Sequence, residues 1–152
     1  MSFRVLGTNH TSFTVSDLDR SIAFFRDCLG FEVTSKAPRE PELTARVTGI
    51  PGAEITVAYV RGPGHSLELI EFRGPADRGR VSARACDTGA FHLAYNVDNL
   101  DAALAAVAAD FRAGQLQVVS QNLHQRPAVL HFQNPLLSID GELNGEIGRA
   151  HV

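Results

Sequence analysis

Three absences narrow what this chain of 152 residues can be. It has no block or stripe of basic residues and a formal net charge of −3, which argues against nucleic-acid binding. No apolar run is long enough to span a membrane, and the first residues lack the pattern of a secretory signal peptide. We therefore expect a cytoplasmic protein that binds neither nucleic acid nor a membrane.

Cysteine is also scarce. The two cysteines, Cys28 and Cys86, fit no metal-binding or redox spacing, and the expected compartment keeps thiols reduced. We predict two reduced, buried thiols. The sequence likewise contains no glycine-rich phosphate loop and no Gly-x-Ser-x-Gly nucleophile motif.

What the chain does contain is an internal repeat. Segments beginning at His10 and at His92 share the pattern His-x4-Val-x-Asp/Asn-Leu-Asp, and all matched positions are 82 residues apart. A repeat of this length indicates duplication of a supersecondary unit. The length and the ordinary apolar fraction of 44% suit one compact domain, or two small halves that share a core.

Each copy of the repeat begins as a strand with two unlike faces, because side chains alternate across a strand. The apolar face carries Thr11, Phe13 and Val15 in the first copy, and Leu93, Tyr95 and Val97 in the second. The opposite face carries small or polar residues and, in both copies, the histidine.

A helix is expected after each strand. Ser16 and Asp98 stand at the predicted N-cap positions, and Asp19 and Asp101 follow three residues later as a variant of the capping box. Gly30 is expected to end the first helix. Apolar residues recur at helical spacing in both helices, namely Ile22, Phe25 and Leu29 in the first, and Leu100, Leu104 and Val107 in the second.

Further strands are expected after each helix. They are residues 31–35, 53–61 and 65–72 in the first half, and residues 116–120 and 128–132 in the second. A Gly-Pro-Gly turn at 62–64 joins two of them. We predict that residues 38–52 form a loop able to cover a site, and that residues 74–87 form a linker between the halves.

The candidate functional residues are His10, Glu68 and His92. The two histidines occupy equivalent positions in the repeat, and two imidazoles with a carboxylate suit a divalent Fe, Co, Ni, Zn or Mn ion. Open coordination positions would admit water or substrate oxygens. Glu71 is the rival of Glu68, on the opposite face of the same strand, and His65 is expected to be a solvated turn residue.

The motifs around these residues resemble those of the vicinal oxygen chelate superfamily, which includes glyoxalase I, methylmalonyl-CoA epimerase, extradiol dioxygenases and fosfomycin-resistance transferases. The segments that carry the resemblance are Asn9–Thr11, Val15–Ser21, Phe24–Val33, Leu67–Phe72 and Phe91–Val97. The resemblance implies an α+β fold in which two βαβββ repeats form curved sheets around a cavity, the glyoxalase/dioxygenase-like fold.

The expected modules are residues 1–75 and residues 88–134, the second of them incomplete, followed by an atypical tail at 135–152. The family's final ligand glutamate follows an Asp-Pro-Asp-Gly turn, which this chain lacks. The matching ligand position in this chain is Gly141. Asp140 or Glu142 could be the ligand only after a one-residue shift, and such a shift turns a side chain to the other face of a strand. The last seven residues match one translated frame of a common sequencing adapter, which suggests that the tail is partly an artefact.

The activity implied by the resemblance is that of a metal-dependent lyase or isomerase of the glyoxalase/epimerase type. One divalent ion (Ni, Co, Zn, Fe or Mn), held by His10, Glu68 and His92, would chelate vicinal oxygens of a small-molecule substrate, and Glu68 would also be the catalytic carboxylate. The alternatives are an extradiol-type ring-cleaving dioxygenase and a non-catalytic, bleomycin-resistance-like ligand-binding protein. Small members often share sites between two subunits, which implies a homodimer.

Overall fold

The computed structural model describes residues 3–81, 84, 86–110, 119–121 and 128–133. These residues belong to two compact units, residues 1–78 and residues 79–152. The predicted tail at 135–152 lies outside the described residues, and with it both candidates for a fourth ligand, Asp140 and Glu142. No helix in the described part of the chain is long and apolar enough to cross a membrane.

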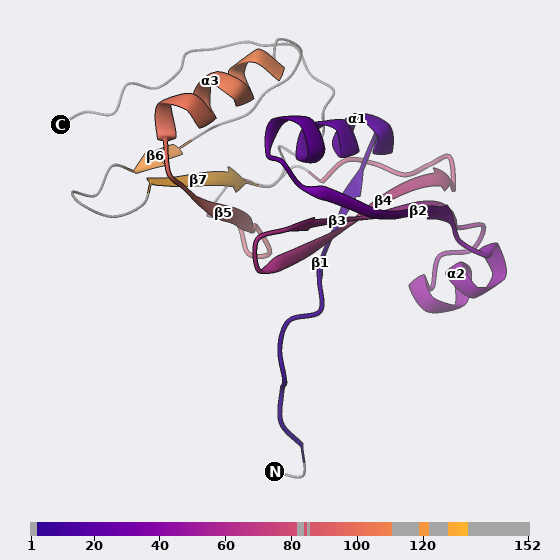
Figure 1. The fold of residues 1–152 in the computed structure, drawn as a ribbon. Helices are drawn as coiled ribbons and strands as arrows, with labels where there is room; N and C mark the ends of the chain where they lie inside the picture. Colours follow the sequence, from indigo (N-terminus) through magenta and orange to yellow (C-terminus); the bar gives the residue numbers. More distant parts are fainter. Residues whose placement is uncertain (1–2, 82–83, 85, 111–118, 122–127, 134–152) are drawn as a thin grey trace. The chain divides into compact units, whose positions relative to one another are not determined.

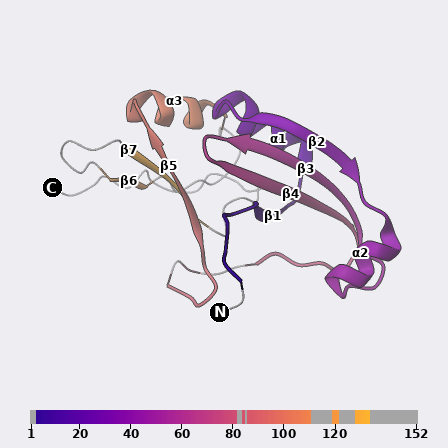
Figure 2. The same ribbon diagram turned by 60° about the horizontal axis from the view of Figure 1, so that its bottom comes forward.

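The first unit contains a four-stranded sheet in the order β1-β4-β3-β2. Its strands are β1 (Thr11–Val15), β2 (Glu32–Pro38), β3 (Glu54–Gly62) and β4 (His65–Gly74). β1 runs parallel to β4, and the other neighbouring strands are antiparallel. The sheet is curved and open, as Figures 1 and 2 show, and the predicted α+β class is confirmed.

The helix after β1, α1 (Leu18–Ala23), begins one residue later than predicted. Its N-cap is Asp17 in place of Ser16, and in the second unit Asn99 takes the place of Asp98. Each of these side chains accepts a hydrogen bond from the backbone N–H three residues further on, at 2.9 Å and 3.0 Å. Both caps satisfy an N–H group that has no acceptor within its helix, and they occupy equivalent positions of the repeat.

A π-helical stretch, η1 (Phe24–Cys28), continues α1. Phe24 and Phe25 are both buried, with ring centroids 5.3 Å apart. The predicted apolar stripe is confirmed except at Leu29, which is half-buried, and Gly30 adopts a φ of 70° at the helix end, as expected.

The core of the first unit lies between α1–η1 and one face of the sheet (Figure 1). Phe13 and Val15 of β1 are buried there, which confirms the apolar face predicted for this strand. The largest fully buried side chains are Phe24, Phe25, Leu18, Leu67, Leu69, Val60 and Ser21, together with Val57, which alternation along β3 places on the other face of the sheet. Burial of this apolar surface is the main term that stabilises the unit.

The segment predicted as a loop, residues 38–52, contains a helix, α2 (Pro41–Thr48). Glu40 caps it, because both carboxylate oxygens accept hydrogen bonds from the first backbone N–H groups, and a proline at the first helical position needs no acceptor. Gly49, at a φ of 71°, ends the helix. The prediction of a loop was wrong, because the cap at Glu40, the proline at the first helical position and Gly49 together are the signals of a short helix.

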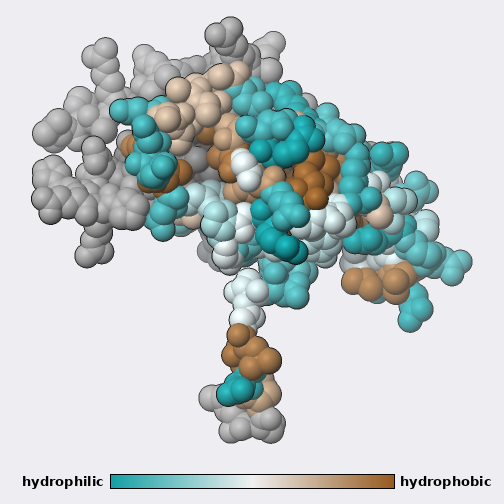
Figure 3. Space-filling view, in the orientation of Figure 1, coloured by the Kyte–Doolittle hydropathy of each residue, from teal (hydrophilic) through white to brown (hydrophobic). Residues whose placement is uncertain are grey.

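Apolar side chains are exposed at two places on the first unit (Figure 3). α2 packs against β3 and buries Thr44, while Leu43 and Val47 are 54% and 77% exposed. The extended segment that leads to β1, residues 3–10, exposes large apolar side chains as well, namely Phe3, Val5 and Leu6.

The second unit repeats the opening of the first. It contains β5 (His92–Val97), α3 (Leu100–Asp110), β6 (Val119–Gln121) and β7 (Ala128–Gln133), with an antiparallel sheet in the order β5-β7-β6. Side chains of β5 alternate between half-buried and exposed as predicted, and Val107 of the predicted α3 stripe is buried.

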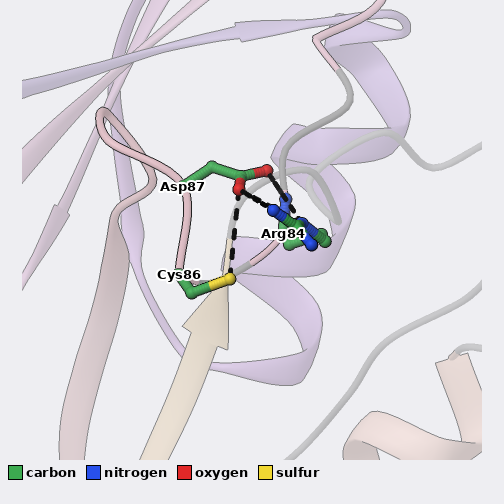
Figure 4. A network of polar contacts seen from close by, with 3 residues as sticks. All are labelled: Arg84, Cys86 and Asp87. Atoms are coloured by element: carbon green, nitrogen blue, oxygen red, sulfur yellow. Dashed lines mark hydrogen bonds and ion pairs between the residues drawn. The ribbon is translucent and has the colours of Figure 1, made fainter.

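The two cysteines differ from the prediction in burial. Neither is in a disulfide, but Cys28 is half-buried and Cys86 is exposed. Cys86 lies in the turn before β5, where its Sγ is 3.9 Å from Asp87 Oδ1 and the Arg84 guanidinium pairs with the same carboxylate at 2.7 Å (Figure 4). A charged turn, rather than the core, therefore surrounds this thiol.

Gly62 offers a test of the packing of the β3–β4 hairpin. A Cβ atom at this position would lie 2.3 Å from Cζ of Phe31, a ring that is itself buried. We expect Gly62→Ala to lower the free energy of unfolding by about 1–3 kcal/mol, as overpacking does, and urea denaturation measures this. Gly7→Ala is the control, because nothing lies within 4 Å of its Cβ position.

Adding Phe31→Leu to Gly62→Ala should restore part of the lost stability, because it removes the atoms that the new methyl group meets. Undiminished stability of Gly62→Ala would show that the hairpin is not packed against Phe31 as described.

Candidate functional site

β4 separates the two candidate glutamates onto opposite faces of the sheet. Leu67 and Leu69 are both fully buried in the core. Because side chains alternate along a strand, Glu68 between them points to the opposite face, whereas Glu71 is on the core side. The two faces of the strand therefore give the two carboxylates different surroundings.

Glu71 has a structural partner at the start of α1. Its Oε2 accepts a hydrogen bond from the backbone N–H of Leu18 at 3.2 Å. Leu18 is the first residue of the helix, where N–H groups have no acceptor within the helix and a negative charge is favourable. Glu71 thus stabilises the helix and lies on the side of the sheet that Glu68 does not face.

His10 lies directly before β1, and its ring points at Glu68. The strand register pairs Ser12 with Glu68, and alternation puts His10 on the same face as Ser12. Nε2 of His10 is 3.3 Å from Oε2 of Glu68, while Nδ1 is 2.6 Å from Oδ1 of Asn9. Asn9 therefore holds the ring by one nitrogen and leaves the other facing the carboxylate.

The distance between His10 and Glu68 indicates what can lie between them. With Asn9 Oδ1 as acceptor, the Nδ1 atom carries the proton, so a neutral ring turns the lone pair of Nε2 toward a carboxylate oxygen. Two acceptors repel unless a cation, either a proton or a metal ion, lies between them.

The spacing of 3.3 Å suits an ion pair between a protonated imidazole and the carboxylate, although it is longer than the about 2.7–2.9 Å of a short charge-assisted N–H···O bond. It equally suits the separation, roughly 3.0–3.4 Å, of two neighbouring ligands that each lie about 2.0–2.2 Å from one ion. The imidazole and the carboxylate therefore fit a shared divalent metal.

Tyr59 completes the group, which we call the His10–Tyr59–Glu68 cluster. Its hydroxyl donates a hydrogen bond to Oε1 of Glu68 at 2.6 Å, and its ring meets that of His10 edge-on, with centroids 5.5 Å apart. This hydrogen bond, helped by burial, raises the pKa of Tyr59 above its ordinary value, while the charge of Arg39 acts in the opposite direction. The carboxylate stabilises the protonated phenol.

The sequence analysis missed Tyr59, although a signal was present. The Gly-Pro-Gly turn pairs Gly62 with His65, and counting back along the antiparallel strands places Tyr59 directly opposite Glu68. Directly opposed residues on one face of a sheet are close enough to interact.

Of the three predicted ligands, the structure brings together His10 and Glu68. His92 is the first residue of β5 and belongs to the second unit, on the strand face opposite Leu93 and Tyr95. Among the residues that the structure describes, no group of three or more His, Cys, Asp or Glu side chains is arranged to hold a metal ion. His92 stays a predicted ligand.

His65 is not the solvated turn residue that was predicted. It begins β4 and is half-buried, with Nε2 3.0 Å from Oγ1 of Thr11. Alternation along β4 places it on the face of Leu67, opposite that of Glu68, so it is separate from the His10–Tyr59–Glu68 cluster.

Titration of the two tyrosines tests the cluster. Burial raises the pKa of Tyr95 to about 12, and Glu68 raises the pKa of Tyr59. We expect ultraviolet absorbance of the metal-free protein to show little tyrosinate at pH 10.0, the ordinary pKa of tyrosine. Glu68→Gln removes the carboxylate charge and should shift the Tyr59 step to lower pH. Glu71→Gln should leave it in place, and an unshifted step in Glu68→Gln would contradict the contact.

Comparison with known proteins identifies the family. A curated relative, a 2-epi-5-epi-valiolone epimerase from an Actinomyces species, is 28% identical over 145 residues, which cover 93% of this chain and 70% of that protein. The crystal structure of a glyoxalase family protein from Bacillus cereus has the same fold, with a TM-score of 0.64 and 22% identity over 82% of this chain and 83% of that one. Residues 7–111 match the family model, so the chain belongs to the Glyoxalase/Bleomycin resistance protein/Dioxygenase superfamily, as the resemblance to vicinal oxygen chelate proteins predicted.

Proposed function

We propose that this chain is a metal-dependent isomerase or lyase of the glyoxalase/epimerase type, acting on a small molecule with neighbouring oxygen atoms. The observation that carries the proposal is the 3.3 Å approach of His10 Nε2 to Glu68 Oε2. Asn9 and Tyr59 occupy the other ring nitrogen and the other carboxylate oxygen. Membership of the superfamily and the similarity to an epimerase support this choice of reaction.

The proposed ligands of the ion are His10 and Glu68 from the first module and His92 from the second. Such a set suits one divalent Ni, Co, Zn, Fe or Mn ion. When bound, the ion would supply Lewis acidity toward substrate oxygens. A further carboxylate, from Asp140 or Glu142, would come from residues outside the described part of the chain.

Glu68 is also the residue proposed to move a proton. A carboxylate is a common general base for abstraction next to a carbonyl group. The Glu68 side chain is only 16% exposed and has a different partner at each oxygen, so its orientation is fixed before a substrate arrives. The proposed role of His10, which Asn9 orients, is to bind the ion next to Glu68.

The modules at 1–75 and 88–134 are part of the proposal. Each has a histidine where its first strand starts, with His10 directly before β1 and His92 as the first residue of β5. Each strand is followed by a helix whose N-cap occupies the equivalent place, at Asp17 and at Asn99. A duplicated unit of this kind would supply one histidine from each half.

Metal uptake tests the proposal. After removal of metal by a chelator and reloading, elemental analysis should find about one divalent ion per chain, because metal affinity needs the complete ligand set. His10→Ala and Glu68→Gln should each abolish this stoichiometric uptake, and His92→Ala tests the third ligand. Glu71→Gln and His65→Gln are the matched controls, because both residues lie on the other face of β4.

Unchanged uptake in both His10→Ala and Glu68→Gln would overturn the site. A wild-type protein that folds but takes up no metal would instead favour the non-catalytic binding protein. The reaction itself can be followed by nuclear magnetic resonance in D₂O, as exchange of a substrate C–H for deuterium, beginning with 2-epi-5-epi-valiolone, the compound in the relative's name. Oxygen consumption with a catechol would point to the extradiol dioxygenase.

A homodimer is also proposed, and its support is the exposed apolar surface of the first unit. Val5 and Leu6 are 83% and 85% exposed, and α2 exposes Leu43 and Val47. Large exposed apolar side chains in neighbouring positions are typical of interaction surfaces. Light scattering at micromolar concentration should give about twice the chain mass of 16.4 kDa, and Val5→Asp with Leu6→Asp should lower it. A monomeric wild type would contradict the proposal.

A further inference from the structure

We infer that Tyr59 is a positioning residue of the proposed metal centre: its hydroxyl fixes Glu68 so that a single carboxylate oxygen, Oε2, faces the ion beside His10. The inference rests on the proposed function, because it concerns a ligand of that same site. It assigns a role to a residue that the metal-ligand pattern of the sequence does not include.

The two oxygens of Glu68 are in different environments. Oε1 accepts the hydrogen bond from the Tyr59 hydroxyl at 2.6 Å, and Oε2 faces Nε2 of His10 at 3.3 Å. An oxygen that accepts a short hydrogen bond has less electron density to offer a metal ion, and its position is tied to the donor. The carboxylate is therefore prepared to bind through one oxygen rather than through both.

Tyr59 is itself held in place. It lies in β3, directly opposite Glu68 in the β3–β4 ladder, and its neighbours in sequence, Ala58 and Val60, are fully buried. Its ring packs edge-on against His10 at an interplanar angle of 86°. The backbone register and the ring contact together direct the hydroxyl toward the carboxylate.

Other polar side chains lie near this face of the sheet, since Ser12 is directly opposite Glu68 in β1, Ser66 pairs with Arg61, and the charge of Arg39 acts on Tyr59. The pair next to Tyr59 and Glu68 on one side is Val57 with Ile70, which offers no donor. On the other side, Arg61 extends toward the carboxylate of Glu32, at 4.0 Å. Tyr59 donates the short hydrogen bond, at 2.6 Å, that orients Glu68.

Tyr59→Phe removes the hydroxyl and keeps the ring that packs against His10. Loss of a group that orients a metal ligand typically weakens metal binding by about 10–100-fold. We expect a fall of that size in affinity for Co²⁺, with the stoichiometry of one ion per chain retained. The released Oε1 would also join the coordination, so the visible d–d absorption of bound Co²⁺ should weaken as its coordination number rises.

The matched control is Tyr95→Phe, the same substitution at the other tyrosine of the chain, on β5. It should leave both the Co²⁺ affinity and the absorption spectrum as in the wild type. Thermal unfolding of both metal-free variants verifies that they are folded before the titration.

Infrared spectra of the wild type supply a readout that needs no Tyr59 variant. The Glu68 band is identified in the metal-free protein by its loss in metal-free Glu68→Gln. When Zn²⁺ binds to the wild type, this band should move to the wide separation of carboxylate stretches that belongs to binding through one oxygen. A narrow separation, or a Tyr59→Phe protein with wild-type Co²⁺ affinity and spectrum, would overturn the role of Tyr59 alone. A wild type that binds no Co²⁺ through His10 and Glu68 would overturn the proposed function as well.

Discussion

The position of β4 between β1 and β3 is the constraint on which the first unit depends. Hydrogen bonds on both sides fix its register, and the burial of Leu67 and Leu69 fixes which face meets the core. A slip of one residue would send Glu68 into the core and both leucines to the other face, at a large cost in buried apolar surface. Packing of the core therefore decides where the candidate site forms.

The same strand serves stability on one face and carries the candidate site on the other. On the core side, Glu71 stabilises the start of α1, because its carboxylate accepts a hydrogen bond from the backbone N–H of Leu18. On the opposite side, Glu68 meets Tyr59 and His10, so that a largely buried carboxylate keeps polar partners at both oxygens. Without such partners, burial of the charge would be costly.

Duplication accounts for the presence of two candidate histidines. Both units open with a strand and a capped helix, and both place a histidine at the start of the strand, at His10 and at His92. The carboxylate does not follow the repeat, because the position 82 residues after Glu68 is Ala150, outside the described residues.

Much of this architecture is determined by local sequence. Alternation of apolar residues predicted the strands, and helical spacing predicted the apolar stripes of α1 and α3, because both patterns arise from backbone geometry alone. The internal repeat predicted that the two histidines are equivalent. The same rules placed each helix cap one residue too early, since two adjacent polar residues both satisfy the local signal.

Only the tertiary structure decided which glutamate accompanies His10, because the choice depends on which face of β4 the core buries. It also revealed Tyr59, whose partner is nine residues away in sequence but directly opposite across the hairpin. Side chains from different strands meet through strand pairing, and a local pattern of residues does not contain the register of that pairing.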